Sequence, residues 1–266
     1  MKHHSSTMIA LWSTMSLILC ATAWSQNPGT PASEFGKARL YVSPSTGIQY
    51  AMIPAGRFVM GSNKGNADEV PVHEEAITAP FYLGIYEVTQ EQWQNIIGDK
   101  LPNRSAHKDP TNLRLPVEYL SLSKAQEFCK QLTGKEGRLC RLPTEVEWEY
   151  ACRAGTISAY YLGESSDDLE KVGWYAGNAA SQTHEVGLKP PNAWGLFDMH
   201  GNVWEWCDTR YFNRYDRHLN TSGTWVARGG SANSPAQDCR SACRKALSNL
   251  VQRKDLGFRV LMEIKP

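Results

Sequence analysis

The sequence predicts an α+β fold with a few helices, short antiparallel strands and little other regular structure. Three short segments between residues 89 and 155 combine helix caps with a helical spacing of apolar residues. Strand-like segments precede them. From Thr156 onward, roughly 110 residues show almost no helical periodicity and are rich in Gly, Asn, Pro, Ser and Trp. That composition favours irregular loops joined by short strands.

Two segments near the start of the domain are expected to form strands. Residues 47–61, GIQYAMIPAGRFVMG, alternate loosely between apolar and polar residues around a Pro-x-Gly turn. This pattern predicts a β-hairpin. Residues 81–89, FYLGIYEVT, are aromatic and β-branched, which is typical of a strand.

Three helices are predicted from residues that suit their ends. Each starts at a Ser or Thr cap and ends at a Gly, and the pairs are Thr89 and Gly98, Ser123 and Gly134, and Thr144 and Gly155. Gln92 and Glu147 stand three residues after the first and third caps, as a capping box requires. The glutamates of the third helix are expected to form cap and ion-pair contacts.

The first 25 residues have the pattern of a secretory signal peptide. They hold Lys2, an apolar run over residues 8–23, no acidic residue and an Ala-x-Ser motif before Gln26. The apolar run is short for a membrane span of about 20 residues. An uncleaved anchor or a lipid anchor at Cys20 are the alternatives. We expect a periplasmic or secreted protein with no stable membrane insertion after cleavage.

The remaining chain is nearly neutral and divides into a linker and a domain. Residues 26–46 begin with a segment rich in Pro, Gly, Ser and Ala, which predicts a linker, and residues 47–266 form the domain. Without Lys2 the chain has 27 basic and 27 acidic residues, since 28 Lys and Arg stand against 27 Asp and Glu in the whole sequence. No basic field is present to attract nucleic acid or an anionic membrane.

Six cysteines remain after signal cleavage, namely Cys129, Cys140, Cys152, Cys207, Cys239 and Cys243. An even number of cysteines in a protein of an oxidising compartment is expected to form disulfides, and six cysteines allow 15 connectivities. The spacing of Cys239 and Cys243, four residues apart behind a Gly-Gly pair, leaves a reactive or metal-binding pair as the alternative.

Five motifs in order resemble the formylglycine-generating enzyme family, also called the sulfatase-modifying-factor family. They are IPAGRFVMGS (53–62), RLPTEVEWEYACRAGT (141–156), PNAWGLFDMHGNVWEWC (191–207), RGGS (228–231) and LGFRV (256–260). The resemblance covers about residues 47–262. It implies a single compact domain related to C-type lectins, often bound to calcium.

A calcium site follows from the resemblance at DMHGNVWEW. By position its ligands are the side chains of Asp198 and Glu205 and the carbonyls of Gly201 and Val203. Oxygen ligands of this kind suit calcium. The alternative is that Glu205 pairs with an arginine, Arg228 or Arg259, and that Trp204 and Trp206 are core residues.

The resemblance also implies copper chemistry, because formylglycine-generating enzymes hold copper(I) between two cysteines and oxidise a cysteine of a sulfatase. Counted from Ser231 of RGGS, those positions are Ser234 and Cys239, so one thiolate is missing. Cys243 could replace it, which makes Ser231, Cys239 and Cys243 the candidate catalytic residues. The resemblance alternatively implies a Cys152–Cys239 disulfide.

Two functions from different classes are therefore compatible with the sequence. The first is an exported oxidoreductase that modifies a protein or peptide. The second is a non-catalytic, lectin-like module that binds a protein, peptide or glycan. Chemistry without the copper pair, as in relatives that act in siderophore maturation, is a third possibility.

Overall fold

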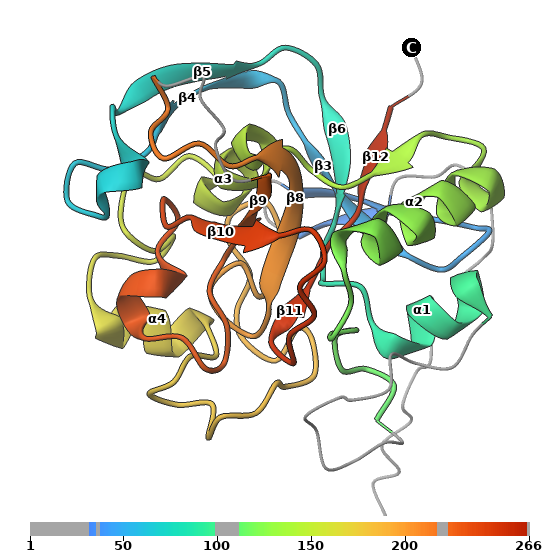
Figure 1. The fold of residues 1–266 in the computed structure, drawn as a ribbon. Helices are drawn as coiled ribbons and strands as arrows, with labels where there is room; N and C mark the ends of the chain where they lie inside the picture. Colours follow the sequence, from blue (N-terminus) through green and yellow to red (C-terminus); the bar gives the residue numbers. More distant parts are fainter. Residues whose placement is uncertain (1–31, 36–37, 99–111, 217–222, 265–266) are drawn as a thin grey trace, which may run out of the picture.

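The structure is a computed structural model that describes residues 32–35, 38–98, 112–216 and 223–264 (Figure 1). The predicted signal peptide, residues 1–25, lies outside these ranges. The helices of the described residues are α1 (Gln90–Ile97), α2 (Leu122–Glu136), α3 (Glu145–Arg153) and α4 (Ser166–Val172), with two 3-10 helices, η1 (Ala67–Glu69) and η2 (Ala236–Cys239). No helix among them is long and apolar enough to cross a membrane.

The strands of the described residues form three sheets. The largest has the order β1 (Ala32–Phe35), β2 (Ala38–Val42), β3 (Gln49–Ile53), β6 (Phe81–Gly84), β12 (Leu261–Glu263) and β7 (Cys140–Arg141). A second has the order β10 (Lys245–Ser248), β9 (Thr224–Arg228), β8 (Trp204–Arg210) and β11 (Leu256–Gly257). The third is the pair β4 (Gly56–Met60) and β5 (His73–Ile77). The predicted α+β fold with short, mostly antiparallel strands is confirmed.

The predicted hairpin over residues 47–61 is wrong, although both of its strands exist. β3 pairs with β2 and β6, whereas β4 pairs with β5 in a separate sheet. Three of the five residues of β3 are buried, as expected of a strand between two neighbours. Because long-range pairing decides the sheet, the local turn signal at Pro54 was not sufficient.

The predicted linker, residues 26–46, contains two strands among its described residues. β2 pairs with β3, with Tyr41 opposite Tyr50 and Leu40 opposite Ala51. The composition rich in Pro and Gly ends at Gly36, and the alternation of ARLYV is that of a strand.

The three predicted helices are present, with shifts at their ends. α1 and α3 have the predicted capping boxes at Thr89 and Thr144. α2 is capped by Ser121 and Gly137 in place of the predicted Ser123 and Gly134, so Gly134 lies inside the helix. α3 ends one residue early, because Ala154 adopts the left-handed conformation. α4, with a capping box at Ser165, was not predicted.

Two large hydrophobic clusters form the core. One contains Trp204 and Trp206 together with the apolar faces of α1 and α2, and the other contains Trp148 of α3. Figure 1 shows α1 and α2 on one side of the molecule, α4 on the other, and β4 and β5 across the top. α3 packs against β4, β8 and β9 between them.

Candidate functional site

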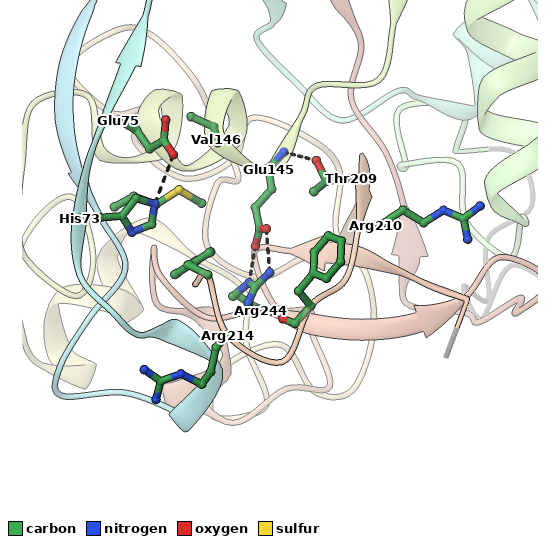
Figure 2. A pocket seen from close by; sticks show the side chains of 11 residues that line it. His73, Glu75, Glu145, Val146, Thr209, Arg210, Arg214 and Arg244 are labelled. Carbon is green, nitrogen blue, oxygen red and sulfur yellow. Dashed lines mark hydrogen bonds and ion pairs between the residues drawn. The ribbon is translucent and has the colours of Figure 1, made fainter. Parts of the chain in front are cut away.

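A small pocket lies between the start of α3, the strand β5 and the end of β8 (Figure 2). Its volume is about 160 Å³. The lining side chains come from distant parts of the chain and are Met60, His73, Glu75, Glu145, Val146, Thr209, Arg210, Phe212, Arg214, Tyr215 and Arg244. Arg, Met and aromatic residues are the types enriched in protein interfaces.

The Glu145–Arg244 pair fixes the centre of the pocket. The Arg244 guanidinium donates to both Glu145 carboxylate oxygens at 2.6 and 2.9 Å, and also to the carbonyls of Asp68 and Phe212. It lies over the Tyr211 and Tyr215 rings, at 4.9 and 4.2 Å from their centroids. Burial opposes the charge of Arg244, but the Glu145 carboxylate outweighs it and raises the pKa of Arg244. Arg244 is therefore a rigid part of the fold.

Charged side chains surround this pair. His73 Nε2 lies 3.2 Å from a Glu75 carboxylate oxygen. Figure 2 shows Arg210 and Arg214 pointing outward on opposite sides of the pocket. Arg210 lies over the Trp225 ring at 4.7 Å, and Arg214 pairs with Asp216. A ligand that crossed the pocket would meet Arg210 at one end and the Arg214–Asp216 ion pair at the other.

A buried network beneath the pocket links α3 to the strand that precedes the RGGS motif. Arg228 donates to Glu149 at 2.5 Å and lies 3.0 Å from Glu145, while Arg153 pairs with Glu149 at 2.8 Å. Arg228 also donates to the carbonyls of Ser241 and Cys243. The ion-pair contacts predicted for the glutamates of α3 are thus present.

The serines of the RGGS region form a closed hydrogen-bond network. Ser231 Oγ donates to Asp255 at 2.9 Å and lies 2.9 Å from Ser234 Oγ. Asp255 also pairs with Arg253 at 2.8 Å. Burial would raise the pKa of Asp255, but Arg253 and Ser231 outweigh it and lower that pKa. With both hydroxyls buried and bonded to each other, Ser231 has the environment of a structural residue.

The two cysteines considered for catalysis are buried and poorly suited to ionise. Cys239 is fully buried, and its Sγ lies close to the position that a Cβ on Gly230 would take. Burial, followed by the neighbouring Cys243, raises the pKa of Cys239 above its usual range. Burial raises the pKa of Cys243 to about 12, and its Sγ lies 3.8 Å from Asn66 Nδ2. In the absence of a metal, these surroundings favour the neutral thiol form of both cysteines.

The Cys152–Cys239 disulfide implied by the resemblance is not formed in this structure, where all six described cysteines are free and buried. Cys152 Sγ faces Ser241 Oγ at 3.7 Å and the His200 ring at 3.9 Å. His200 Nδ1 lies 2.8 Å from the carbonyl oxygen of Cys239. Cys152 and Cys239 also belong to different hydrophobic clusters.

Glu205, a predicted calcium ligand, is paired with Arg259. Arg259 donates to both carboxylate oxygens of Glu205 at 2.7 Å, and Trp148 Nε1 donates to one of them at 2.7 Å. This is the ion pair that the sequence left open as an alternative, with Arg259 rather than Arg228 as partner. Trp204 and Trp206 are both core residues.

Asp198, the other predicted carboxylate ligand, keeps one oxygen without a partner. Its Oδ2 accepts from the Gly187 N–H at 2.7 Å, whereas its buried Oδ1 has no hydrogen-bond partner. Burial raises the pKa of Asp198 to about 6. Glu87 lies nearby, and burial together with Asp198 and Glu205 raises its pKa well above the usual value. Arg259 is hydrogen-bonded to Glu205, and the charges of all three carboxylates raise the pKa of Arg259.

No cluster of three or more His, Cys, Asp or Glu side chains in the described ranges is arranged to hold a metal ion. The predicted calcium site does not depend on such a cluster, because two of its four ligands are carbonyls. The charge and the oxygen atoms of these residues fit a cation. Asp198 Oδ1 has no hydrogen-bond partner, and the carboxylates of Glu87, Asp198 and Glu205 outnumber the single guanidinium of Arg259. Calcium would have to share Glu205 with Arg259.

The model of the family described as "Sulfatase-modifying factor enzyme 1-like domain" matches residues 42–264. The chain belongs to this family. An inactive C-alpha-formylglycine-generating enzyme 2 from Bos taurus is 25% identical over 272 residues, covering 80% of this chain and 87% of the relative. Treponema denticola variable protein 1 has a similar structure, with a TM-score of 0.76, 26% identity and coverage of 86% of this chain and 99% of that one.

A serine/threonine-protein kinase, pkn1, from Chlamydia caviae is 30% identical over 248 residues, which are 82% of this chain and 38% of the kinase. The chain therefore spans little more than a third of the kinase's length.

Sequence reasoning missed several site residues of this sulfatase-modifying-factor domain. Glu87 lies inside FYLGIYEVT, which the sequence predicts only as a strand, and a glutamate among aromatic residues was the available signal. The pocket residues His73, Arg210 and Tyr215 belong to none of the five motifs. Their proximity depends on how β5 and the segment after β8 pack.

Proposed function

We propose that this chain is a non-catalytic binding module of the sulfatase-modifying-factor family that recognises a protein or peptide. The observation that carries the proposal is the residue at the first copper position. Ser234 stands there, and its hydroxyl is bonded to Ser231 at 2.9 Å in a buried network. A hydroxyl in that network does not replace a copper(I) thiolate, because copper(I) prefers soft sulfur ligands.

The remaining thiols support the same conclusion. Cys239 is fully buried and Cys243 is 2% exposed, and burial raises the pKa of both. A copper oxidase needs thiolates that the metal and the substrate can reach. The chain is similar both to a relative named as inactive, at 25% identity, and to a formylglycine-generating enzyme of Mus musculus, at 28%, so the proposal rests on residues 234, 239 and 243.

The pocket between β5, α3 and β8 is the proposed recognition site. At about 160 Å³ it is smaller than the ~300–1,000 Å³ typical of small-molecule sites, so it suits one side chain of a larger ligand. Arg210 and Arg214 on its flanks, with Tyr215 in its wall, are residue types that dominate binding energy at protein interfaces.

We further propose that calcium has a structural role at Asp198, Gly201, Val203 and Glu205. The support is the unpaired buried Oδ1 of Asp198 and the excess of carboxylates around Arg259. A bound cation would neutralise that excess and satisfy the free oxygen. The site lies in the core beneath the loops, so its expected effect is on stability.

Catalysis is tested with a sulfatase-type C-x-P-x-R peptide, supplied with copper(I) and oxygen and followed by mass spectrometry. We expect no conversion to formylglycine, whereas a copper-containing formylglycine-generating enzyme converts the peptide in parallel. Conversion by this chain at a comparable rate would overturn the proposal.

Binding is tested by selecting peptides from a displayed random library on the immobilised protein and measuring the affinity of the enriched peptides. Arg210→Ala and Arg214→Ala are expected to weaken binding by roughly tenfold or more. Lys130→Ala on the exposed side of α2 is the control and should leave the affinity unchanged. Equal affinities for all variants would exclude the pocket.

A further inference from the structure

Two of the six described cysteines lie on adjacent elements of one core cluster. Cys129 is in the middle of α2 and Cys140 begins β7, and both are 3% exposed in the cluster that includes Phe128 and Leu132. The chain between them turns at Gly137, which ends α2 in the left-handed conformation. This turn folds β7 back against the helix.

Thr133 connects the two cysteine backbones. Its Oγ1 donates to the Cys129 carbonyl at 2.9 Å and lies 3.2 Å from the Cys140 carbonyl, while the Cys140 N–H donates to it at 2.9 Å. Residues four apart share a helix face, so Cys129 lies one turn from Thr133 on the side that contacts β7. The two thiols are also electrostatic neighbours, since after burial Cys140 is the largest influence that raises the pKa of Cys129.

The other described thiols have different surroundings. Cys152 faces Ser241 and His200, and Cys207 Sγ lies 3.9 Å from the Glu205 carbonyl. Cys239 lies against Gly230 in a third cluster, and Cys243 lies next to Asn66. Cys243 contributes to the raised pKa of Cys239, and a turn in which the Cys243 N–H donates to the Arg240 carbonyl at 3.0 Å separates the two residues.

We propose that Cys129 and Cys140 form an intramolecular disulfide that clamps α2 to β7. Both thiols are free in this structure, so their Sγ atoms must come within bonding distance inside the cluster, while Thr133 already links the two backbones. β7 pairs with β12 at the edge of the large sheet, so the clamp would join α2 to that edge. The inference is independent of the proposed binding function.

The step is a thiol–disulfide exchange. One thiolate attacks the disulfide of an oxidant, such as oxidised glutathione or a protein thiol oxidase, and releases one thiol of the oxidant. The second thiolate attacks the mixed disulfide, so the two cysteines lose two protons and two electrons and the oxidant becomes two thiols. Burial raises the pKa of Cys140 to about 12, so exchange is slow in the folded protein and occurs while the chain folds.

The test maps the bond after refolding. The reduced full chain is refolded from denaturant in a buffer of oxidised and reduced glutathione, alkylated in denaturant and digested with trypsin. Lysine and arginine sites place Cys129 in AQEFCK (125–130) and Cys140 in LCR (139–141), with cleavage sites between them. We expect a species that joins these two peptides and that separates on reduction.

The melting temperature and two cysteine variants give further tests of the disulfide. The refolded chain is expected to melt about 5–10 °C higher than its reduced form. Cys140→Ser should abolish that difference and leave Cys129 open to alkylation, whereas Cys207→Ala should keep the linked peptides. Alkylation of both Cys129 and Cys140 in the refolded wild type, or a bond from Cys129 to another cysteine, overturns the proposal. The peptide map of the refolded wild-type chain tests the proposal even if a variant fails to fold.

Discussion

Replacing Glu149 by Gln tests whether the buried arginine network holds this fold together. Glu149 is fully buried and accepts hydrogen bonds from the Gly61 N–H at 2.9 Å, from Arg153 at 2.9 Å and from Arg228 at 2.5 Å. A glutamine keeps the shape but turns one acceptor oxygen into an N–H group. That group would face a donor whichever way the amide is oriented.

The expected loss follows from the charges that remain. In the wild type Arg153, Arg228 and Arg244 share two carboxylates, those of Glu145 and Glu149. E149Q leaves one carboxylate for three buried cations. Removing one partner from a buried ion pair costs about 3–5 kcal/mol of unfolding free energy. For a domain of this size the melting temperature should fall by roughly 6–20 °C.

The pH dependence gives an independent check. Burial would raise the pKa of Glu149, but Arg228 and Arg153 outweigh it and hold that pKa below its usual value. Such a carboxylate stabilises the fold above its unfolded pKa of about 4.3, and the stabilisation is lost as the pH falls through the folded pKa. The difference between wild type and E149Q should therefore shrink below about pH 4.3.

Urea unfolding at several pH values between about 3.5 and 7 measures both effects. Glu127→Gln is the control, because its pair with Lys124 is exposed and should contribute at most about 0.5 kcal/mol. A loss below about 1 kcal/mol at neutral pH, or a difference that grows in acid, would refute the reasoning.

Three further changes test other parts of the structure. Calcium at about 100 times its dissociation constant should raise the melting temperature by roughly 5–10 °C, and Asp198→Asn should remove that shift; no shift in the wild type would contradict the site. Thr144→Ala should cost about 1–2 kcal/mol in urea unfolding, because Thr144 caps α3, and an unchanged midpoint would show that the cap is dispensable. Gly230→Ala should cost more than about 3 kcal/mol, since Gly230 has a φ of +78° and an added Cβ would meet Cys239; soluble protein of wild-type stability would argue against this packing.

Local signals in the sequence were sufficient for helices and insufficient for pairing. Thr89 and Thr144 identified α1 and α3 because a capping box needs only residues within one turn. α2 has two serines at its start and a glycine inside it, and packing of Phe128 and Leu132 extends the helix past the exposed Gly134. An interior glycine costs about 1 kcal/mol, which that burial outweighs. β3 and β4 were mispaired because their partners, β6 and β5, follow later in the chain.

The candidate site was predictable only where its residues belong to a motif. Glu145, Arg228 and Arg259 stand in motifs that carry the resemblance, and each is a buried member of an ion pair. The pocket residues His73 and Tyr215 are brought together by contact between β5 and the segment after β8, with ring centroids 4.9 Å apart. No spacing in the sequence encodes that contact.

In the proposed non-catalytic role, Ser234 marks where this chain departs from the copper-binding pattern while keeping the other family motifs. Arg228, three residues before Ser231, pairs with α3, and Arg259 of LGFRV pairs with Glu205 of the WEW segment. Neither ion pair uses the side chain of Ser234, Cys239 or Cys243, and Arg228 contacts Cys243 only through its backbone carbonyl. A serine can therefore replace the first thiolate at little cost to the fold. A match to these motifs consequently predicts the architecture, whereas we propose that the residues at positions 234 and 239 decide whether copper chemistry is available.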